Sequence, residues 1–218
     1  MMNTMRKVDL MMFDFDGTLA DTGADIAASV NHALTSLGLA SLPVEKILGF
    51  VGDGVRILME RSLGEDRRGR LDEAMDFFID YYQKHLLDHT RLYPEAEEML
   101  NFFHYQKKVI LTNKHYDLTL AIAKGLKIDR HFMEIVGADS TPFQKPDGRV
   151  VTYLLEKYGI APQKAVLIGD SRNDVAAARN AGILSCVYLN GMGNREAMLK
   201  MGADFYFEHL MEIQFLFQ

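Results

Sequence analysis

Five short runs of apolar residues recur along the chain, and each run is nearly continuous rather than interrupted at every second position. They cover residues 8–15, 108–112, 134–137, 165–169 and 184–189. A strand that is buried on both faces needs apolar residues at successive positions, which is typical of a parallel sheet covered by helices on both sides. The runs therefore predict a parallel sheet buried inside the protein.

Helical patterns fill the spaces between these runs from about residue 90 onward. They cover residues 94–105, 116–126, 147–158 and 173–181, with Pro94 suited to a first helical turn and Gly182 to a C-terminal cap. Strands that alternate with helices indicate an α/β fold with a doubly wound, Rossmann-like parallel sheet.

The segment between the first and second runs has a different pattern. It contains no strand pattern, and its apolar residues fall on helical faces, for example Ile26, Val30 and Leu34. We therefore expect an α-helical domain inserted after the first strand. The predicted division is an α/β core domain at 1–20 and 88–218 and a helical domain at 21–87.

Composition limits the cellular compartment and the classes of binding partner that we expect. Cys186 is the only cysteine among 218 residues, so no disulfide can form within the chain and a reducing compartment fits. The formal net charge is -6 without a basic stripe, which argues against a nucleic-acid partner. No apolar stretch has the length of a membrane span, and acidic residues interrupt the N-terminal stretch where a signal peptide would be apolar. We expect a cytoplasmic protein that binds neither membrane nor nucleic acid.

Two carboxylates follow the first apolar run. Asp14 and Asp16 point the same way while the chain is extended, and they lie at the carboxyl end of the predicted strand, where α/β sheets bind ligands. Two like charges in such a place are costly without a cation, and carboxylate oxygens suit Mg²⁺ better than zinc. A turn made from Asp16 and Gly17 is the alternative interpretation.

Polar residues follow three later segments as well. Asp170 is a candidate third metal ligand and Asp174 could orient Asp170 or a nearby cation, although acids at a helix N-terminus also serve as caps. Thr112 and Asn113 follow a strand and could donate hydrogen bonds to a phosphate, or could form an ordinary turn. Lys145 could supply a positive charge for a phosphoryl group, but a single Lys-Pro pair carries little information by itself.

Taken in chain order, these elements resemble the motifs of the haloacid dehalogenase superfamily over residues 8–204. A closer resemblance is to phosphoglycolate phosphatases, at residues 13–22, 50–55, 112–114 and 169–174. Two positions depart from that pattern. Many relatives have Lys-Pro-x-Pro where this chain has Lys145-Pro146-Asp147-Gly148, and His115 stands where proline is common. Both departures bear on the substrate more than on the reaction.

The resemblance implies a mechanism and a metal. Asp14 would be the nucleophile that forms an aspartyl-phosphate, and Asp16 the general acid and base. Mg²⁺ would be bound by a carboxylate oxygen of Asp14, the backbone carbonyl of Asp16 and a carboxylate oxygen of Asp170. Asp174 would orient Lys145 or a metal-bound water.

The resemblance also implies the substrate contacts. Thr112 and Lys145 would complete the catalytic set, and the residues around the substrate would be Gly17, Thr18, Thr112, Asn113, Lys145 and Arg56. The helical insertion would be a cap domain that closes over the site. Arg56 would bind a substrate carboxylate, although it could equally lie on a solvated helix face.

The function expected from this resemblance is Mg²⁺-dependent hydrolysis of a small phosphorylated metabolite, 2-phosphoglycolate or a similar monoester, by a monomer or homodimer. A phosphosugar mutase similar to beta-phosphoglucomutase, or a pyrophosphatase, are alternatives within the superfamily. A non-catalytic phospho-receiver or interaction module is the alternative from another class, but receivers need no helical insertion.

Overall fold

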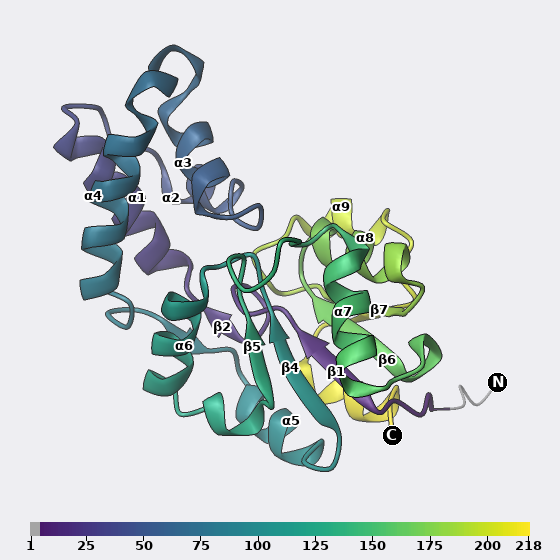
Figure 1. The fold of residues 1–218 in the computed structure, drawn as a ribbon. Helices are drawn as coiled ribbons and strands as arrows, with labels where there is room; N and C mark the ends of the chain where they lie inside the picture. The colour runs from purple at the N-terminus through teal and green to yellow at the C-terminus, as the bar shows by residue number, and fades with distance from the viewer. Residues whose placement is uncertain (1–4) are drawn as a thin grey trace.

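A computed structural model describes residues 5–218 and shows one parallel sheet at the centre of the protein (Figure 1). Its strand order is β5-β4-β1-β6-β7-β8, and every pair of neighbours is parallel. The strands are β1 (Leu10–Phe13), β4 (Lys107–Leu111), β5 (Glu134–Val136), β6 (Ala165–Gly169), β7 (Leu184–Tyr188) and β8 (Phe205–Phe207). The predicted doubly wound, Rossmann-like fold is confirmed.

Helices cover both faces of this sheet. Successive residues of a strand point to opposite faces, so Met11 and Phe13 pack with α5 (Ala96–Phe102) and α6 (Tyr116–Gly125). Leu10 and Met12 pack with α7 (Gly148–Tyr158) and α8 (Arg172–Ala181) on the other face. Two short helical segments, α9 (Arg195–Leu199) and the 3₁₀ helix Leu210–Phe215, follow toward the C-terminus. The continuous apolar runs are explained because β1, β4 and β6 are buried on both faces.

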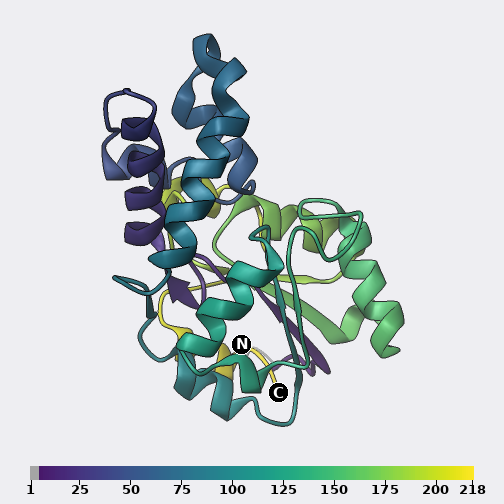
Figure 2. The same ribbon diagram turned by 60° about the vertical axis from the view of Figure 1, so that its left-hand side comes forward.

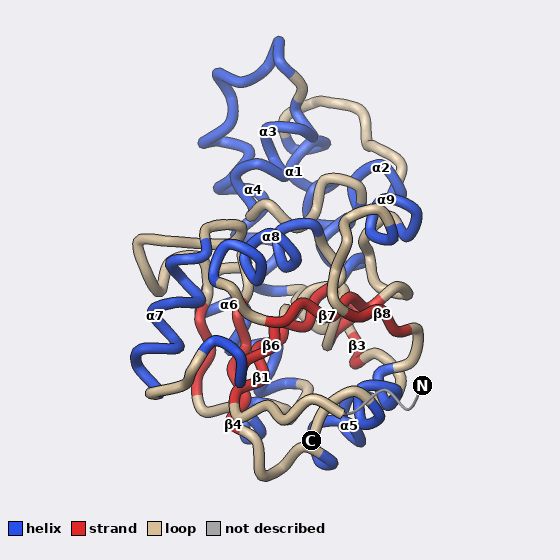
Figure 3. The backbone as a smooth tube through the Cα atoms, turned by 90° about the vertical axis from the view of Figure 1, so that its right-hand side faces the viewer, coloured by secondary structure: helices blue, strands red, loops and turns tan. Residues whose placement is uncertain are grey.

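The helical insertion forms a separate group of helices beyond the carboxyl edge of the sheet, which we call the cap (Figures 1 and 3). It consists of α1 (Gly23–Ser36), α2 (Val44–Leu48), α3 (Val55–Leu63), the 3₁₀ helix Glu65–Arg70 and α4 (Leu71–Lys84). Figure 2 shows α1 and α4 side by side, where the apolar face of α1 meets Phe78 and Tyr82 of α4.

A small antiparallel pair of strands joins the two chain segments that lead into and out of the cap. Ala20 of β2 (Ala20–Asp21) pairs with Leu92 of β3 (Arg91–Leu92). This strand pair lies close to both predicted domain boundaries, at 20/21 and 87/88, and these boundaries stay a prediction. Within residues 5–218, no helix is both long enough and apolar enough to cross a membrane.

Candidate active site

The carboxyl ends of three neighbouring strands bring the predicted site residues together. β1 lies between β4 and β6. After β1 the chain forms β4 and β5 on one side of it, and then crosses to form β6, β7 and β8 on the other side. This is the switch point at which an open α/β sheet forms a crevice. Asp14 follows β1, Thr112 follows β4 and Asp170 follows β6, so residues far apart in the sequence meet at one edge.

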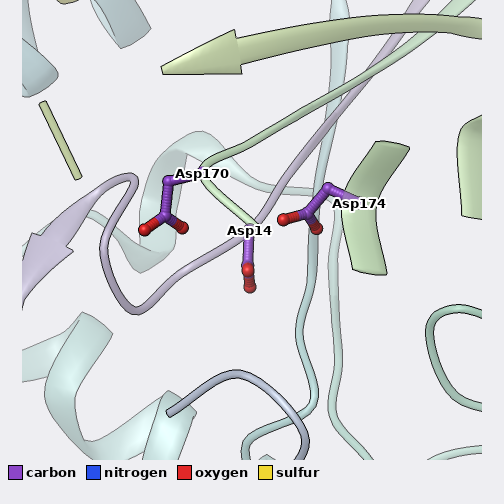
Figure 4. Close-up of side chains that lie close together, drawn as sticks. All are labelled: Asp14, Asp170 and Asp174. Atoms are coloured by element: carbon purple, nitrogen blue, oxygen red, sulfur yellow. The ribbon is translucent and has the colours of Figure 1, made fainter. Parts of the chain in front are cut away.

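An acidic cluster occupies this edge. Carboxylate oxygens of Asp14, Asp170 and Asp174 lie within 4.8 Å of one another, and all three side chains are buried. In Figure 4 the Asp14 side chain lies between those of Asp170 and Asp174. Burial, together with the negative charge of Asp174, raises the pKa of Asp14 to about 8 and that of Asp170 to about 7. For Asp14, burial and the neighbouring carboxylates outweigh the positive charge of Lys145, and the all-oxygen donor set of the cluster fits a hard divalent cation.

Lys145 is the cation inside this cluster. Its Nζ lies 2.9 Å from Oδ1 of Asp14 and 2.6 Å from Oδ1 of Asp174, and only 1% of its side chain is exposed. Burial alone would lower the pKa of Lys145, but the two carboxylates outweigh that effect and raise it. Lys145 is therefore held charged beside the predicted nucleophile.

Asp174 serves both as a helix cap and as a partner of Lys145. Its Oδ2 accepts hydrogen bonds from the backbone N–H and the hydroxyl of Ser171, 3.0 and 2.6 Å away, at the start of α8. Its Oδ1 accepts the hydrogen bond from Lys145. The capping and orienting interpretations of this residue are thus compatible.

Asp170 is held by a loop that the sequence patterns did not single out. Its Oδ2 accepts hydrogen bonds from the backbone N–H groups of Met192 and Gly193, at 2.7 and 3.0 Å, and its Oδ1 lies 3.2 Å from the Thr18 hydroxyl. A Cβ at Gly17, where φ is +84°, would lie 2.2 Å from the Asp170 carboxylate. Glycine is therefore needed at this position, and Gly17 and Thr18 shape the pocket around Asp170.

Asp16 faces a lysine and a tyrosine that were not predicted as site residues. Lys114 Nζ donates to Asp16 Oδ1 at 3.0 Å and to the Tyr82 hydroxyl at 2.7 Å, and the Thr22 hydroxyl donates to Asp16 at 2.6 Å. Lys114 was within reach of sequence reasoning because it directly follows Thr112 and Asn113. Tyr82 was not, because its spacing in α4 is that of a core residue.

The side-chain amide of Asn113 has partners other than the expected phosphate. It donates to the backbone carbonyls of Gly52 and Lys145, each at 2.9 Å. Both of its N–H groups are thereby used, so the expectation that this amide donates to a phosphate is not supported by its contacts. The Thr112 hydroxyl accepts a hydrogen bond from the Lys114 backbone N–H at 3.2 Å.

Arg56 lies outside the site. Its side chain is 61% exposed on α3, and its nitrogens are 3.8 Å from Glu60 and 3.4 Å from Asp72. It does not line the cavity described below. The structure therefore agrees with the alternative interpretation of Arg56 as part of a solvated helix face, and not with its expected role in binding the substrate.

A cap loop is fastened to the core beside the site. The Gly52 carbonyl accepts hydrogen bonds from both Asn113 and Asn173, and Asp53 accepts one from Asn173 at 2.7 Å and one from Arg172 at 3.1 Å. These contacts join the loop before α3 to the start of α8. We call residues 52–53 with Arg172 and Asn173 the clasp.

A cavity of about 50 Å³ lies between cap and core. Asp14, Asp16 and Thr112 line it from the core, together with Lys114 and His115. The cap and the core contribute an apolar wall, made by Ile26, Val51, Val55, Leu58, Phe78 and Leu118. The predicted nucleophile therefore faces a small, largely apolar space.

Comparisons with known proteins identify the family. The model of a family described as haloacid dehalogenase-like hydrolases matches residues 11–188. A phosphoglycolate phosphatase of Chromobacterium violaceum is 34% identical over 216 residues, which cover 96% of each chain. One from Neisseria gonorrhoeae is 36% identical over 194 residues, 86% of this chain and 82% of the relative.

Solved structures have the same fold. The crystal structure of a predicted phosphoglycolate phosphatase from Haemophilus somnus superposes with a TM-score of 0.90 at 28% identity, covering 95% of this chain and 96% of that one. A haloacid dehalogenase-like family hydrolase from Streptococcus pneumoniae gives a TM-score of 0.86 at 26% identity, with 95% and 97% of the two chains covered.

Proposed function

This chain belongs to the haloacid dehalogenase-like hydrolase family, and we propose that it hydrolyses a small phosphate monoester through an aspartyl-phosphate on Asp14. The observation that carries the proposal is the convergence of Asp14, Asp170, Asp174 and Lys145 at the carboxyl edge of the sheet. The Asp14 carboxylate also lines the cavity between cap and core. A phosphate seated there would meet a nucleophile and a fixed cation.

In the first step, a carboxylate oxygen of Asp14 attacks phosphorus and the ester bond to the leaving oxygen breaks. Asp14 Oδ1 already accepts hydrogen bonds from Lys145 and from the Phe15 backbone, whereas Oδ2 accepts none among residues 5–218. We therefore assign the attack to Oδ2. Asp16 gives its proton to the leaving alkoxide, which departs as an alcohol.

In the second step, water attacks the phosphorus of the aspartyl-phosphate. Asp16, now ionised, takes the proton of that water, and Asp14 is regenerated as inorganic phosphate departs. Lys145, held by Asp174, offsets negative charge on the phosphoryl group in both steps. The Thr22 hydroxyl and Lys114 keep the Asp16 carboxylate in place beside the cavity.

We propose Mg²⁺ as the metal that the acidic cluster binds. Carboxylate oxygens of Asp14 and Asp170 and the backbone carbonyl of Asp16 would hold it. When bound, the ion supplies positive charge that lets the anionic phosphate approach the anionic nucleophile.

The proposed substrate is 2-phosphoglycolate or a monoester of similar size. Two observations support it: the relatives named above are phosphoglycolate phosphatases, and the cavity is small. A phosphosugar would place several hydroxyls against a largely apolar wall, where few of them would find a hydrogen-bond partner. We therefore favour hydrolysis of a small ester over sugar mutase activity.

The proposal is tested by measuring inorganic phosphate released from a panel of esters, namely 2-phosphoglycolate, sugar phosphates and pyrophosphate. Each is assayed with Mg²⁺ and with EDTA, for the unaltered protein and for Asp14→Asn. The matched control is Asp80→Asn, which makes the same change at a side chain that is 72% exposed. We expect Mg²⁺-dependent release that Asp14→Asn abolishes and Asp80→Asn retains.

Two results would contradict the proposal. Phosphate release that survives Asp14→Asn would remove Asp14 as the nucleophile. Isomerisation of a phosphosugar without release of phosphate would establish a mutase in place of a phosphatase.

A further inference from the structure

A hydrogen-bonded pair of polar side chains lines the cavity that Asp14 also lines. The apolar wall of this cavity includes Ile26, Phe78 and Leu118. The polar pair consists of Lys114 and Tyr82, which are hydrogen-bonded to each other at 2.7 Å. Polar groups beside an apolar wall select for a ligand with a matching polar group.

Lys114 has a donor that a ligand can use. Its Nζ carries three hydrogens and lies 3.0 and 3.2 Å from the two oxygens of the same Asp16 carboxylate. One hydrogen bond is enough to hold Asp16, so another N–H can turn to a ligand without breaking that pair. The side chain is 6% exposed, and an ionic hydrogen bond made there is poorly screened by water.

Tyr82 supplies a second donor. Its oxygen accepts the hydrogen bond from Lys114, and its own O–H has no acceptor among residues 5–218. Burial raises the pKa of Tyr82 to about 12, so this hydroxyl keeps its proton near neutral pH. Because Tyr82 is 1% exposed and lines the cavity, its O–H can find an acceptor in a molecule bound there.

The first turn of α3 adds a third contribution. Gly54 and Val55 line the same cavity at the start of this helix, and no side chain caps it. The first N–H groups of a helix have no partner within the helix and carry partial positive charge. An ammonium group, a hydroxyl donor and a helix N-terminus thus border one small space.

We propose that Lys114 and Tyr82, aided by the first turn of α3, bind a carboxylate carried by the leaving group of the substrate. This inference rests on the proposed phosphatase function and names the residues that would select its substrate. Lys114 takes the role that the sequence suggested for Arg56, which lies outside the cavity. The small volume and the apolar wall restrict the leaving group to a short carbon chain beside that carboxylate.

The first test compares two esters of equal size on the unaltered protein. Beyond the ester oxygen, isobutyl phosphate has the same number of non-hydrogen atoms as 2-phosphoglycolate, but it has no carboxylate. Since charge-assisted hydrogen bonds are lost with the neutral ester, we expect kcat/KM to be about 100-fold higher for 2-phosphoglycolate.

The second test measures the same ratio of kcat/KM values in variants. Lys114→Met keeps the length of the side chain without its charge and should lower the ratio to about tenfold or less. Tyr82→Phe removes only the hydroxyl and should lower the ratio about fivefold. Arg56→Met is the matched control. It removes a cation of the cap, and because this cation does not line the cavity, the ratio should stay unchanged.

The outcomes separate the subsite from the reaction. Equal hydrolysis of the two esters, or an unchanged ratio in both Lys114→Met and Tyr82→Phe, would overturn the subsite while the phosphatase function stands. A preference for pyrophosphate over 2-phosphoglycolate would overturn the carboxylate as the group bound. Release of phosphate from no ester would overturn the proposed function and the subsite together. The comparison on the unaltered protein decides the matter even if Lys114→Met fails to fold.

Discussion

Lys145 is the residue on which the charge balance of the site depends most directly. Its ammonium lies between the carboxylates of Asp14 and Asp174, and all three side chains are almost fully buried. Removing one member of such a group leaves buried charge without compensation, which costs more than the pair itself contributes. The remaining carboxylates would then have to bind protons or water.

Replacing Lys145 should therefore destabilise the protein as well as inactivate it. We expect Lys145→Met to lower the free energy of unfolding by about 3 kcal/mol in the absence of metal, because Asp14 and Asp174 lose their partner. Urea denaturation in EDTA measures this. The control is Lys84→Met, which breaks an exposed pair with Asp80 and should change the free energy by less than about 0.5 kcal/mol. Equal effects of the two changes would contradict the prediction.

For single residues, the sequence was informative where a reactive type of side chain stands at the end of a predicted strand. Asp14 and Asp170 could be predicted to meet because acids directly follow buried strands, and parallel strands end at one edge. The partners of Asn113 could not be predicted, since Gly52 is 61 residues away and its sequence pattern does not show which part of the core it contacts. The place of Arg56 could not be predicted because helical spacing does not show which face of α3 meets the cavity.

At the scale of elements, the clasp is the contact that positions the cap loop over the core. Asp53 is its centre, because it accepts hydrogen bonds from Asn173 and Arg172 and also pairs with Arg61 at 2.6 Å. These partners hold the pKa of Asp53 below its usual range, although partial burial alone would raise it. A closed cap excludes water from the cavity and completes it.

Breaking the clasp should reduce the fraction of molecules with the cap closed. We expect Asp53→Ala to lower kcat/KM for the best substrate about tenfold, because a binding-competent state that is less populated weakens apparent affinity in proportion. Steady-state kinetics measure this, and the change should appear mostly in KM. The control, Arg68→Ala, removes an exposed side chain that pairs with Glu65 and should leave both constants unchanged. A fall in kcat with an unchanged KM would argue against a role in closure.

Asp25 anchors α1 to the segment that leads from the cap into β3. It is 1% exposed and accepts hydrogen bonds from the His89 and Thr90 backbone N–H groups, at 3.0 and 2.8 Å, and from the Thr90 hydroxyl at 2.7 Å. This contact fixes one of the two chain connections between cap and core.

Asp25→Ala should destabilise the protein strongly. The N–H groups of His89 and Thr90 would be left without acceptors, so we expect the free energy of unfolding to fall by about 2–4 kcal/mol. Chemical denaturation measures this change. The comparison variant is Asp72→Ala, whose carboxylate is 90% exposed and should contribute little. A loss no larger than that of Asp72→Ala would show that the anchor is unimportant.

Elements could be predicted from sequence where they are long or buried on both faces. The five apolar runs correspond to β1, β4, β5, β6 and β7, with ends that differ by at most two residues. β8 was not predicted; it has three residues at the edge of the sheet, between Asp204 and Glu208. β2 and β3 were missed because each has two residues and exists only through pairing with the other. α2 has five residues, which is too short for a helical pattern.

At the scale of the whole molecule, the acidic cluster couples stability to pH and to metal. The pKa of Asp14 is raised from 3.8 to about 8 and that of Asp170 from 3.8 to about 7, chiefly by burial. At pH values between the usual and the raised pKa, these two carboxyl groups keep their protons in the folded protein but have already lost them in the unfolded chain. Stability falls with rising pH wherever the folded state holds more protons, so both groups make the metal-free protein less stable as pH increases from about 4 to 8.

A divalent ion should reverse this trend, because it binds the ionised carboxylates and competes with their protons. We therefore expect the increase in Tm caused by Mg²⁺ to be small near pH 5 and to grow toward about pH 8, while Tm in EDTA declines over the same range. Differential scanning calorimetry with EDTA and with Mg²⁺ at each pH measures both trends. Asp14→Asn removes the titrating group with the larger shift, so it should flatten the decline in EDTA and weaken the effect of Mg²⁺. A Tm in EDTA that rises with pH would contradict the prediction, because it would mean that Asp14 and Asp170 are ionised over the whole pH range. The folded protein would then have to hold several buried carboxylates whose negative charge Lys145 alone cannot compensate.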